Sequence, residues 1–145
     1  MFNMKWDARF LNLAEHVAQW SRDPSTQVGA VIVRPNKTIA SIGYNGFPRG
    51  VDDSPERYAD RDVKYKFVVH AEANAIVAAQ ELLEGFAIFT WPFPPCSDCA
   101  GLIVQSGVKH VVAPKPSREQ IERWGDSFMI AETIFIEGEV KLVLL

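Results

Sequence analysis

Apolar positions in the first part of the chain repeat at helical spacing and then gather in short β-branched runs. Over residues 7–22 they recur at i, i+3 and i+4, which predicts an amphipathic helix that begins near Asp7 and ends before Pro24. Residues 27–34 and 38–44 are short and β-branched, with a Pro-Asn-Lys turn between them. We therefore expect the chain to open with a helix followed by a hairpin.

A long segment that shows neither helical nor strand periodicity follows the hairpin. Residues 45–66 begin with Gly46, Pro48 and Gly50 and continue into an acidic stretch that contains another proline. A structureless run of this length inside a compact domain is usually functional. We expect a long loop here that takes part in the function.

The second half of the chain alternates between strands and helices. The pattern predicts, in order, a helix over 69–83, a strand over 86–91, a helix over 96–106, a strand over 109–113, helices over 118–124 and 126–136, and a strand over 140–145. Strands that alternate with helices are typical of a partly parallel sheet covered on both faces. The predicted fold is α/β, a three-layer α/β/α sandwich with a mixed five-stranded sheet.

Length and charge narrow the class of protein. The chain has 145 residues, 48% of them hydrophobic, which suits a single domain over residues 1–145. The net charge is −3, and no run of Lys or Arg is present, so a nucleic acid is not an expected partner. The sequence also lacks an apolar run of membrane-span length and the apolar core of a secretory signal. We expect a soluble, cytoplasmic protein with no membrane partner.

The only two cysteines, Cys96 and Cys99, are spaced as C-x-x-C, which indicates a metal-ligand pair or a redox pair. At the start of a helix, residues three apart lie about 60° apart around the axis, so both sulfurs can face one ion. The positive end of the helix dipole also favours thiolates. A zinc ion needs further ligands, and the sequence must supply them elsewhere.

His70 is the best third ligand, because it begins another predicted helix and has Glu72 two residues later. Three protein ligands leave the fourth position of zinc open to water, as in catalytic zinc sites, and Glu72 can then accept and deliver the proton. Residues two apart point about 200° apart on an ideal helix. The assignment therefore requires both residues to lie at the helix entry.

Each of these residues also has an ordinary interpretation. The cysteines alone would equally suit a thioredoxin-like redox pair or inert thiols at a helix start. A single histidine is normally a core residue, as we expect for His16 and His110. Glu72 could be a first-turn carboxylate favoured by the helix dipole. The combination favours zinc, since His70-Ala71-Glu72 and Pro95-Cys96-Ser97-Asp98-Cys99 match the H-x-E and P-C-x-x-C signature of zinc nucleobase deaminases.

At this point the sequence resembles the cytidine deaminase superfamily, and within it the deoxycytidylate (dCMP) deaminases. The resemblance covers almost the whole chain and rests on the segments SRDPSTQVGAVIV (21–33), GYNGFPRG (43–50), VHAEANAI (69–76), PPCSDC (94–99) and QSGV (105–108). It implies a cytidine deaminase-like fold, conversion of dCMP to dUMP with release of ammonia, and a homohexamer. It also implies activation by dCTP and inhibition by dTTP, usually with magnesium. The chain has no further cysteine for a second zinc, so we expect one zinc per subunit.

The resemblance also assigns residues to the substrate. It implies that Asn45 contacts the sugar, that the Ala71 N–H and the Pro95 carbonyl read the edges of the pyrimidine, and that Val28 lines the same site. Asn45 could instead serve only as a residue tolerant of positive φ in a turn. Trp91 and Phe93 are either core residues or pocket walls.

The loop is expected to bind the phosphates. A monophosphate needs a cation or a cluster of donors, and the loop offers Arg49, Arg57, Lys64 and Lys66, among which the sequence does not choose. Backbone N–H groups near flexible glycines suit a triphosphate. We therefore assign a regulatory nucleotide to Gly46, Pro48, Arg49 and Gly50.

Three other functions remain open on the sequence. A tRNA adenosine deaminase or a free cytidine deaminase would share the metal motif, although the acidic net charge argues against a tRNA substrate. The zinc could also be structural in a protein-binding module, but a closed structural site requires a fourth protein ligand. A mononucleotide deaminase fits the long loop best.

Overall fold

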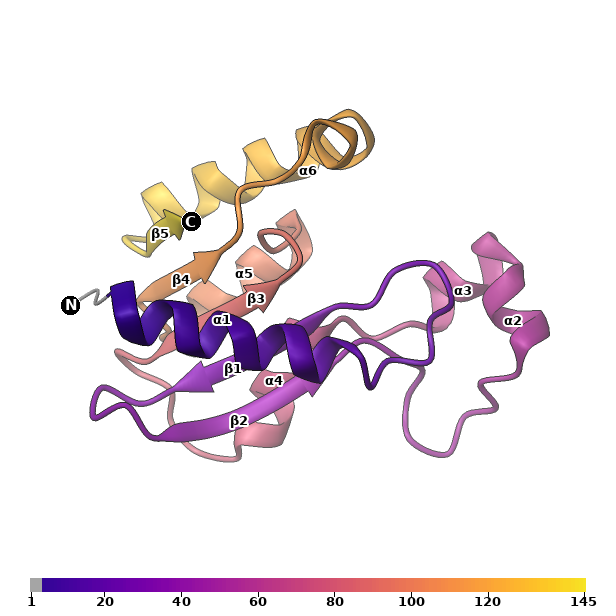
Figure 1. Cartoon of the computed structure of the whole chain (residues 1–145), viewed down its shortest axis with the longest axis horizontal. Coiled ribbons are helices and arrows are strands. Elements are labelled where there is room, and N and C mark those ends of the chain that lie inside the picture. The colour runs from indigo at the N-terminus through magenta and orange to yellow at the C-terminus, as the bar shows by residue number, and fades with distance from the viewer. Residues whose placement is uncertain (1–3) are drawn as a thin grey trace.

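Figure 1 shows the chain as a computed structural model, which describes residues 4–145. Its elements in chain order are α1 (Met4–Ala18), β1 (Gly29–Val33), β2 (Ile39–Tyr44), α2 (Pro55–Ala59), α3 (Arg61–Phe67), α4 (Ala71–Ala79), β3 (Ala87–Trp91), α5 (Ser97–Ser106), β4 (His110–Ala113), α6 (Arg118–Glu137) and β5 (Lys141–Leu144). The helix α2 and its neighbour α3 lie at one end of the molecule, beyond the strands.

The five strands form one mixed sheet in the order β2-β1-β3-β4-β5. Strand β1 pairs antiparallel with both β2 and β3, whereas β4 is parallel to β3 and to β5. The two parallel pairs are joined by crossovers through α5 and α6, as parallel strands require. The mixed five-stranded sheet predicted from the sequence is confirmed.

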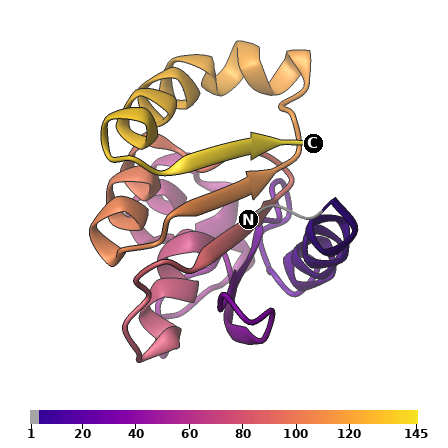
Figure 2. The ribbon, with the colours of Figure 1, turned by 90° about the vertical axis from the view of Figure 1, so that its left-hand side faces the viewer.

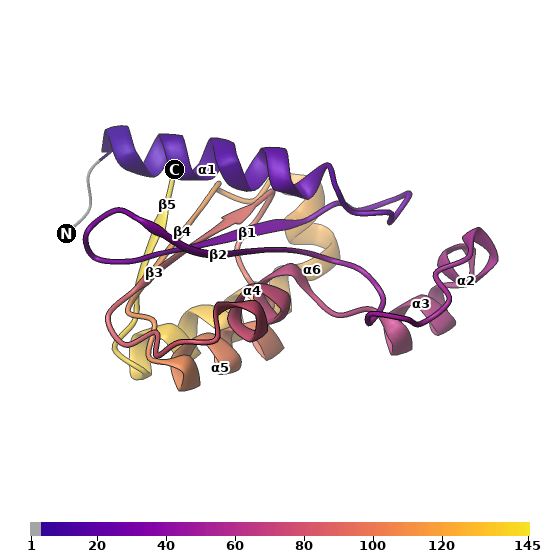
Figure 3. The same ribbon diagram turned by 90° about the horizontal axis from the view of Figure 1, so that it is seen from below.

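Helices cover both faces of this sheet. Figure 3 shows α1 on one side and α4, α5 and α6 on the other, and Figure 2 shows the same separation from the end of the molecule. On the α1 side the backbones approach closely at Gly29, where a β-carbon would overlap the Ala14 carbonyl oxygen. The predicted three-layer α/β/α sandwich is therefore also confirmed.

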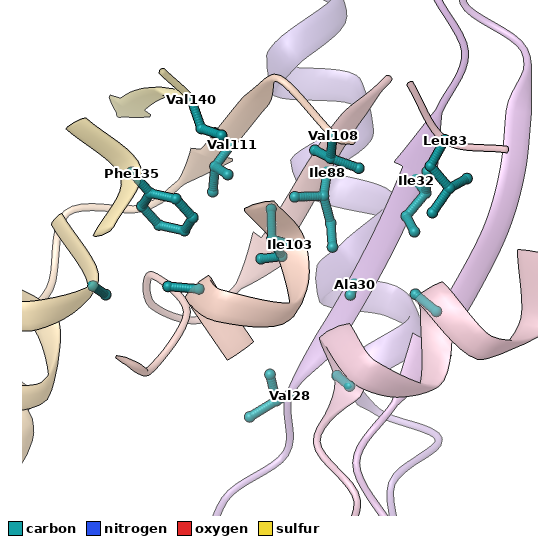
Figure 4. Close-up of a cluster of buried hydrophobic side chains, with 14 residues drawn as sticks. Val28, Ala30, Ile32, Leu83, Ile88, Ile103, Val108, Val111, Phe135 and Val140 are labelled. Atoms are coloured by element: carbon teal, nitrogen blue, oxygen red, sulfur yellow. The ribbon is translucent and has the colours of Figure 1, made fainter. Parts of the chain in front are cut away.

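The core consists of one cluster of side chains beneath each helical layer. Along β1 the side chains alternate, so Ala30 and Ile32 face α4 and α5, while Val31 and Val33 face α1. Figure 4 shows the larger cluster, in which side chains from the sheet meet Ile103 and others from the helices. Because β1 is buried along its whole length, its sequence is a continuous apolar run.

Two predictions made for the connecting segments were wrong. Residues 45–66 are not a structureless loop, because they contain α2 and most of α3; Asp60 starts α3 by accepting hydrogen bonds from the Asp62 and Val63 N–H groups. The two helices expected over 118–124 and 126–136 are one continuous helix, α6, which Gly125 does not interrupt. A glycine inside a helix costs about 1 kcal/mol but does not break it when the helix packs on a core.

Helix boundaries also differ from the expected ones at the functional end of the sheet. Helix α4 begins at Ala71 and α5 at Ser97, two residues and one residue later than predicted, and α1 ends at Ala18.

Within residues 4–145 no helix has the length and hydropathy needed to cross a membrane.

Candidate active site

The three expected metal ligands meet between the N-termini of two neighbouring helices. His70 is the N-cap of α4 and Cys96 is the N-cap of α5; both have extended backbone, and neither side chain caps its own helix. Cys99 lies in the first turn of α5 and is buried. Since His70 precedes the first helical residue, the 200° separation expected for a helix does not apply to His70 and Glu72.

The distances between these side chains fit a zinc ion. His70 Nδ1 lies 3.4 Å from Cys96 Sγ and 3.4 Å from Cys99 Sγ, and the three ligand atoms lie within 4.8 Å of one another. Zinc bonds of about 2.0–2.1 Å to nitrogen and 2.3 Å to sulfur place such ligands about 3.6 Å apart in a tetrahedral site. One imidazole and two thiols in this arrangement support zinc as the bound metal.

The protonation states of the three ligand side chains depend on one another. A hydrogen bond from Cys99 lowers the pKa of Cys96 to about 4, and the hydrogen bond between Cys96 and His70 raises the pKa of the imidazole. The Cys96–Cys99 pair therefore shares a proton between two sulfurs. A bound metal ion replaces that proton, since thiolates and neutral imidazole are the ligand forms.

Glu72 is a buried carboxyl group beside the ligands. Its exposed fraction is 4%, and burial together with the nearby Cys96 raises the pKa of Glu72 to about 7. It is not among the clustered ligand residues. A carboxyl group whose pKa lies near neutrality and which is not a ligand can take and return a proton.

A cavity of about 240 Å³ opens in front of these residues. Its lining side chains come from five separate parts of the chain: Asp23, Thr26, Val28, Asn45, Lys64, Tyr65, Val68, His70, Ala71, Glu72, Phe93, Cys96, Arg123, Trp124 and Phe128. The cavity therefore joins the ligand cluster to the end of the sheet and to α6.

The part of the outer cavity wall that α6 supplies was not foreseen from the sequence. The ring of Phe93 lies 5.0 Å from Trp124 and 5.9 Å from Phe128, both on α6, so Phe93 is a wall residue. Trp91 instead packs against the smaller core cluster. A signal was present, because Trp124, Phe128, Ala131 and Phe135 are spaced as one helical face.

Asn45 is a buried residue whose side chain holds the backbone on one side of the cavity in place. Its Oδ1 accepts a hydrogen bond of 2.8 Å from the Val28 N–H, and its Nδ2 donates to the Thr26 carbonyl at 2.9 Å. Its φ is not positive, so the turn interpretation is wrong. Val28 and Ala71 line the cavity as expected, and Pro95 is buried next to Cys96. The substrate contacts of these four residues remain predictions.

Of the four cations expected to meet a phosphate, only Lys64 lines the cavity. Arg57 donates to the Asp52 carbonyl and lies over the ring of Phe67. Arg49 and Lys66 are exposed and are not among the lining residues.

The expected regulatory residues lie outside the cavity lining as well. Gly46, Pro48, Arg49 and Gly50 do not line it. Gly46 nevertheless exchanges two backbone hydrogen bonds with Val69, the residue before His70, at 3.1 and 2.8 Å. The loop is thereby joined to the first metal ligand.

A mixed sheet that brings one histidine, two cysteines and a buried glutamate together at two helix N-termini defines the class of zinc-dependent nucleobase deaminases. Residues 4–115 match the family described as the cytidine and deoxycytidylate deaminase zinc-binding region. The chain therefore belongs to the cytidine and deoxycytidylate deaminase family.

Individual relatives agree with this family. An uncharacterized deaminase of Aliivibrio fischeri is 43% identical over 97% of this chain and 94% of its own length. The human deoxycytidylate deaminase is 41% identical over 75% of this chain and 64% of its own length. The structure of the dCMP deaminase from cyanophage S-TIM5 in complex with dCMP and dUMP covers all of both chains with a TM-score of 0.75 and 25% identity. The expected cytidine deaminase-like fold is confirmed.

Proposed function

We propose that this chain hydrolyses dCMP to dUMP and ammonia with one zinc ion per subunit. The observation that carries the proposal is the convergence of His70, Cys96 and Cys99 beside the buried Glu72 at the cavity. The relatives named as deoxycytidylate deaminases support dCMP as the nucleotide. Reduced cysteines used as ligands suit a cytoplasmic enzyme.

The chemistry adds water to the pyrimidine and releases its amino group. His70, Cys96 and Cys99 would hold a zinc ion, which would supply the acidity that makes water a nucleophile near neutral pH. Glu72 takes the proton from the attacking water and delivers it to the ring nitrogen. It then moves the proton of the added hydroxyl to the amino group, which leaves as ammonia while the carbonyl of dUMP forms. The raised pKa of Glu72 suits a group that both accepts and donates a proton.

The remaining lining residues hold the substrate in place. We assign the Ala71 N–H and the Pro95 carbonyl to the polar edges of the pyrimidine, and Asn45 to the sugar, with Val28 beside it. The rings of Phe93, Trp124 and Phe128 form an aromatic wall against which a pyrimidine can stack.

The proposal is tested by comparing dCMP with deoxycytidine. The value of kcat/KM for dCMP should exceed that for deoxycytidine at least about tenfold, because charge-assisted hydrogen bonds to a phosphate contribute about 1.5–3 kcal/mol each. The measurement is steady-state ammonia release from the zinc-loaded protein, with CMP and dCTP as further substrates. Equal values for nucleoside and nucleotide would favour a free cytidine deaminase instead.

We further propose a homohexamer that dCTP activates and dTTP inhibits, with magnesium, at Gly46, Pro48, Arg49 and Gly50. Gly50 has a φ of 82° and Arg49 is exposed, so the loop can present backbone N–H groups and a cation to a triphosphate. The Gly46–Val69 bridge offers a physical connection to the metal site. An interface between subunits is supported by exposed apolar side chains on α4, α5 and α6, namely Val77, Leu102, Met129 and Ile130.

Regulation and assembly are tested together. Titration of dCMP in magnesium should show apparent affinities that dCTP raises and dTTP lowers, by about 5- to 150-fold for a coupling of ordinary size. Light scattering on the same sample should give six subunits. A monomer whose hyperbolic curves neither triphosphate shifts would remove this part of the proposal and leave the deaminase intact.

A further inference from the structure

Two cationic side chains other than the ligand histidine line the catalytic cavity, Lys64 and Arg123. Among residues 4–145, Lys64 is paired with a carboxylate, whereas Arg123 is not. The ammonium of Lys64 lies 3.1 Å from the Asp23 carboxylate, and both side chains are almost fully buried, with exposed fractions of 7% and 3%. Lys64 also contacts the Ser25 hydroxyl at 2.9 Å. Its charge is therefore neutralised within the protein.

The surroundings of Asp23 reinforce that pairing. Its carboxylate also accepts hydrogen bonds from the Ser25 N–H at 2.9 Å, the Ser25 hydroxyl at 3.0 Å and the Thr26 N–H at 3.2 Å. Burial by itself would raise the pKa of Asp23, but these donors and Lys64 hold it below its usual value. An anionic ligand would have to displace a carboxylate that already satisfies this whole set of donors.

Arg123 has no such partner. On α6 its guanidinium lies 4.6 Å from the centre of the Trp124 ring, and no carboxylate of residues 4–145 lies within ion-pair distance of it. The residue is exposed while it lines the cavity. Stacking on an aromatic face leaves the N–H edge of a guanidinium available for a planar, two-pronged contact with an oxyanion.

A second cavity of about 250 Å³ adjoins the catalytic one. The two share four lining residues, Thr26, Phe93, Arg123 and Trp124, while Glu119 is the one carboxylate in the lining of the second cavity and is not shared. Ligand sites commonly measure about 300–1,000 Å³. The catalytic cavity alone is below that range and the two together fall within it, so a nucleotide whose ring lies at the zinc ligands would extend toward the shared wall.

Two polar groups on the wall shared by the two cavities are free to bind the part of the nucleotide that reaches it. They are the guanidinium of Arg123 and the hydroxyl of Thr26, for which no hydrogen-bond partner is found among the described residues. We propose that Arg123, together with the Thr26 hydroxyl, binds the phosphate of the nucleotide and gives this site its preference for nucleoside monophosphates over nucleosides. This inference rests on the proposed deaminase function and assigns the phosphate to α6 rather than to the loop cations.

The test is a binding measurement that requires no turnover. Calorimetric titration of the zinc-loaded protein with dUMP and with deoxyuridine gives the contribution of the phosphate as the ratio of the two affinities. In Arg123→Gln this ratio should fall at least about tenfold, since a charge-assisted, two-pronged contact is removed. Arg123→Lys, which keeps the charge but loses the fork, should fall between the two.

Arg118→Gln is the matched control, because it removes the same charge from the same helix at a residue that lines neither cavity. It should leave the ratio unchanged. The inference is overturned if Arg123→Gln keeps the wild-type ratio, if Arg118→Gln lowers it equally, or if the wild-type protein does not distinguish dUMP from deoxyuridine. A failure of the proposed function is seen separately, as absence of ammonia release from dCMP.

Discussion

Glu72→Gln is expected to lose deamination while it keeps its zinc. The substitution preserves the size and polarity of a side chain that is 4% exposed, but the amide cannot carry the proton from water to the pyrimidine. Proton transfer by a positioned side chain commonly contributes about 10²–10⁴-fold, and here the same group serves both the water and the ring. Turnover of dCMP and zinc content, both measured on one preparation, test the expectation.

The control is Glu132→Gln, which changes the same functional group at an exposed position of α6 outside the cavity lining. It should retain both activity and zinc. A Glu72→Gln protein that has lost its metal would show that Glu72 is a ligand rather than a proton carrier. Retention of full turnover would remove its catalytic role altogether.

Cys99→Ala is expected to lose both zinc and activity. Cys99 is 2% exposed, and its sulfur is one of the three ligand atoms that cluster among residues 4–145, so the variant leaves a two-ligand site. Sites with so few protein ligands hold zinc poorly, and the deamination rate should fall to background in step with zinc content. Metal analysis after gel filtration, with circular dichroism to confirm the fold, gives the answer.

Asp98→Ala is the matched control for this experiment. Asp98 is the exposed neighbour of Cys99 in the first turn of α5 and is not among the clustered ligands. It should keep its zinc, which would exclude a general effect of altering this turn. A Cys99→Ala protein that binds zinc and deaminates dCMP at the wild-type rate would contradict the ligand assignment.

The sheet and the metal ligands were predictable because their signals are local. Strand β1 is a continuous apolar run, and the two cysteines lie three positions apart at the start of α5. The H-x-E pair raised a geometric difficulty, since residues two apart diverge on a helix. The structure resolves it by starting α4 at Ala71, which leaves His70 in extended backbone before the helix.

The outer wall of the cavity was not predictable in the same way. Trp124 and Phe128 become wall residues only because α6 continues through Gly125 and packs beside α5, which depends on contacts between distant parts of the chain. Because the two helices predicted from the sequence are divided at Gly125, Trp124 and Phe128 were not placed on one helical face. Likewise α2 and α3 have five and seven residues, which is too short for a reliable period.

The most direct test of zinc-dependent dCMP deamination is a product balance on the purified protein. Zinc-loaded protein is incubated with dCMP, and dUMP and ammonia are quantified in the same sample, before and after removal and restoration of the metal. The structure predicts equal amounts of dUMP and ammonia, loss of both on zinc removal and recovery of both on zinc addition. A zinc-loaded, folded protein that leaves dCMP unchanged would contradict the account.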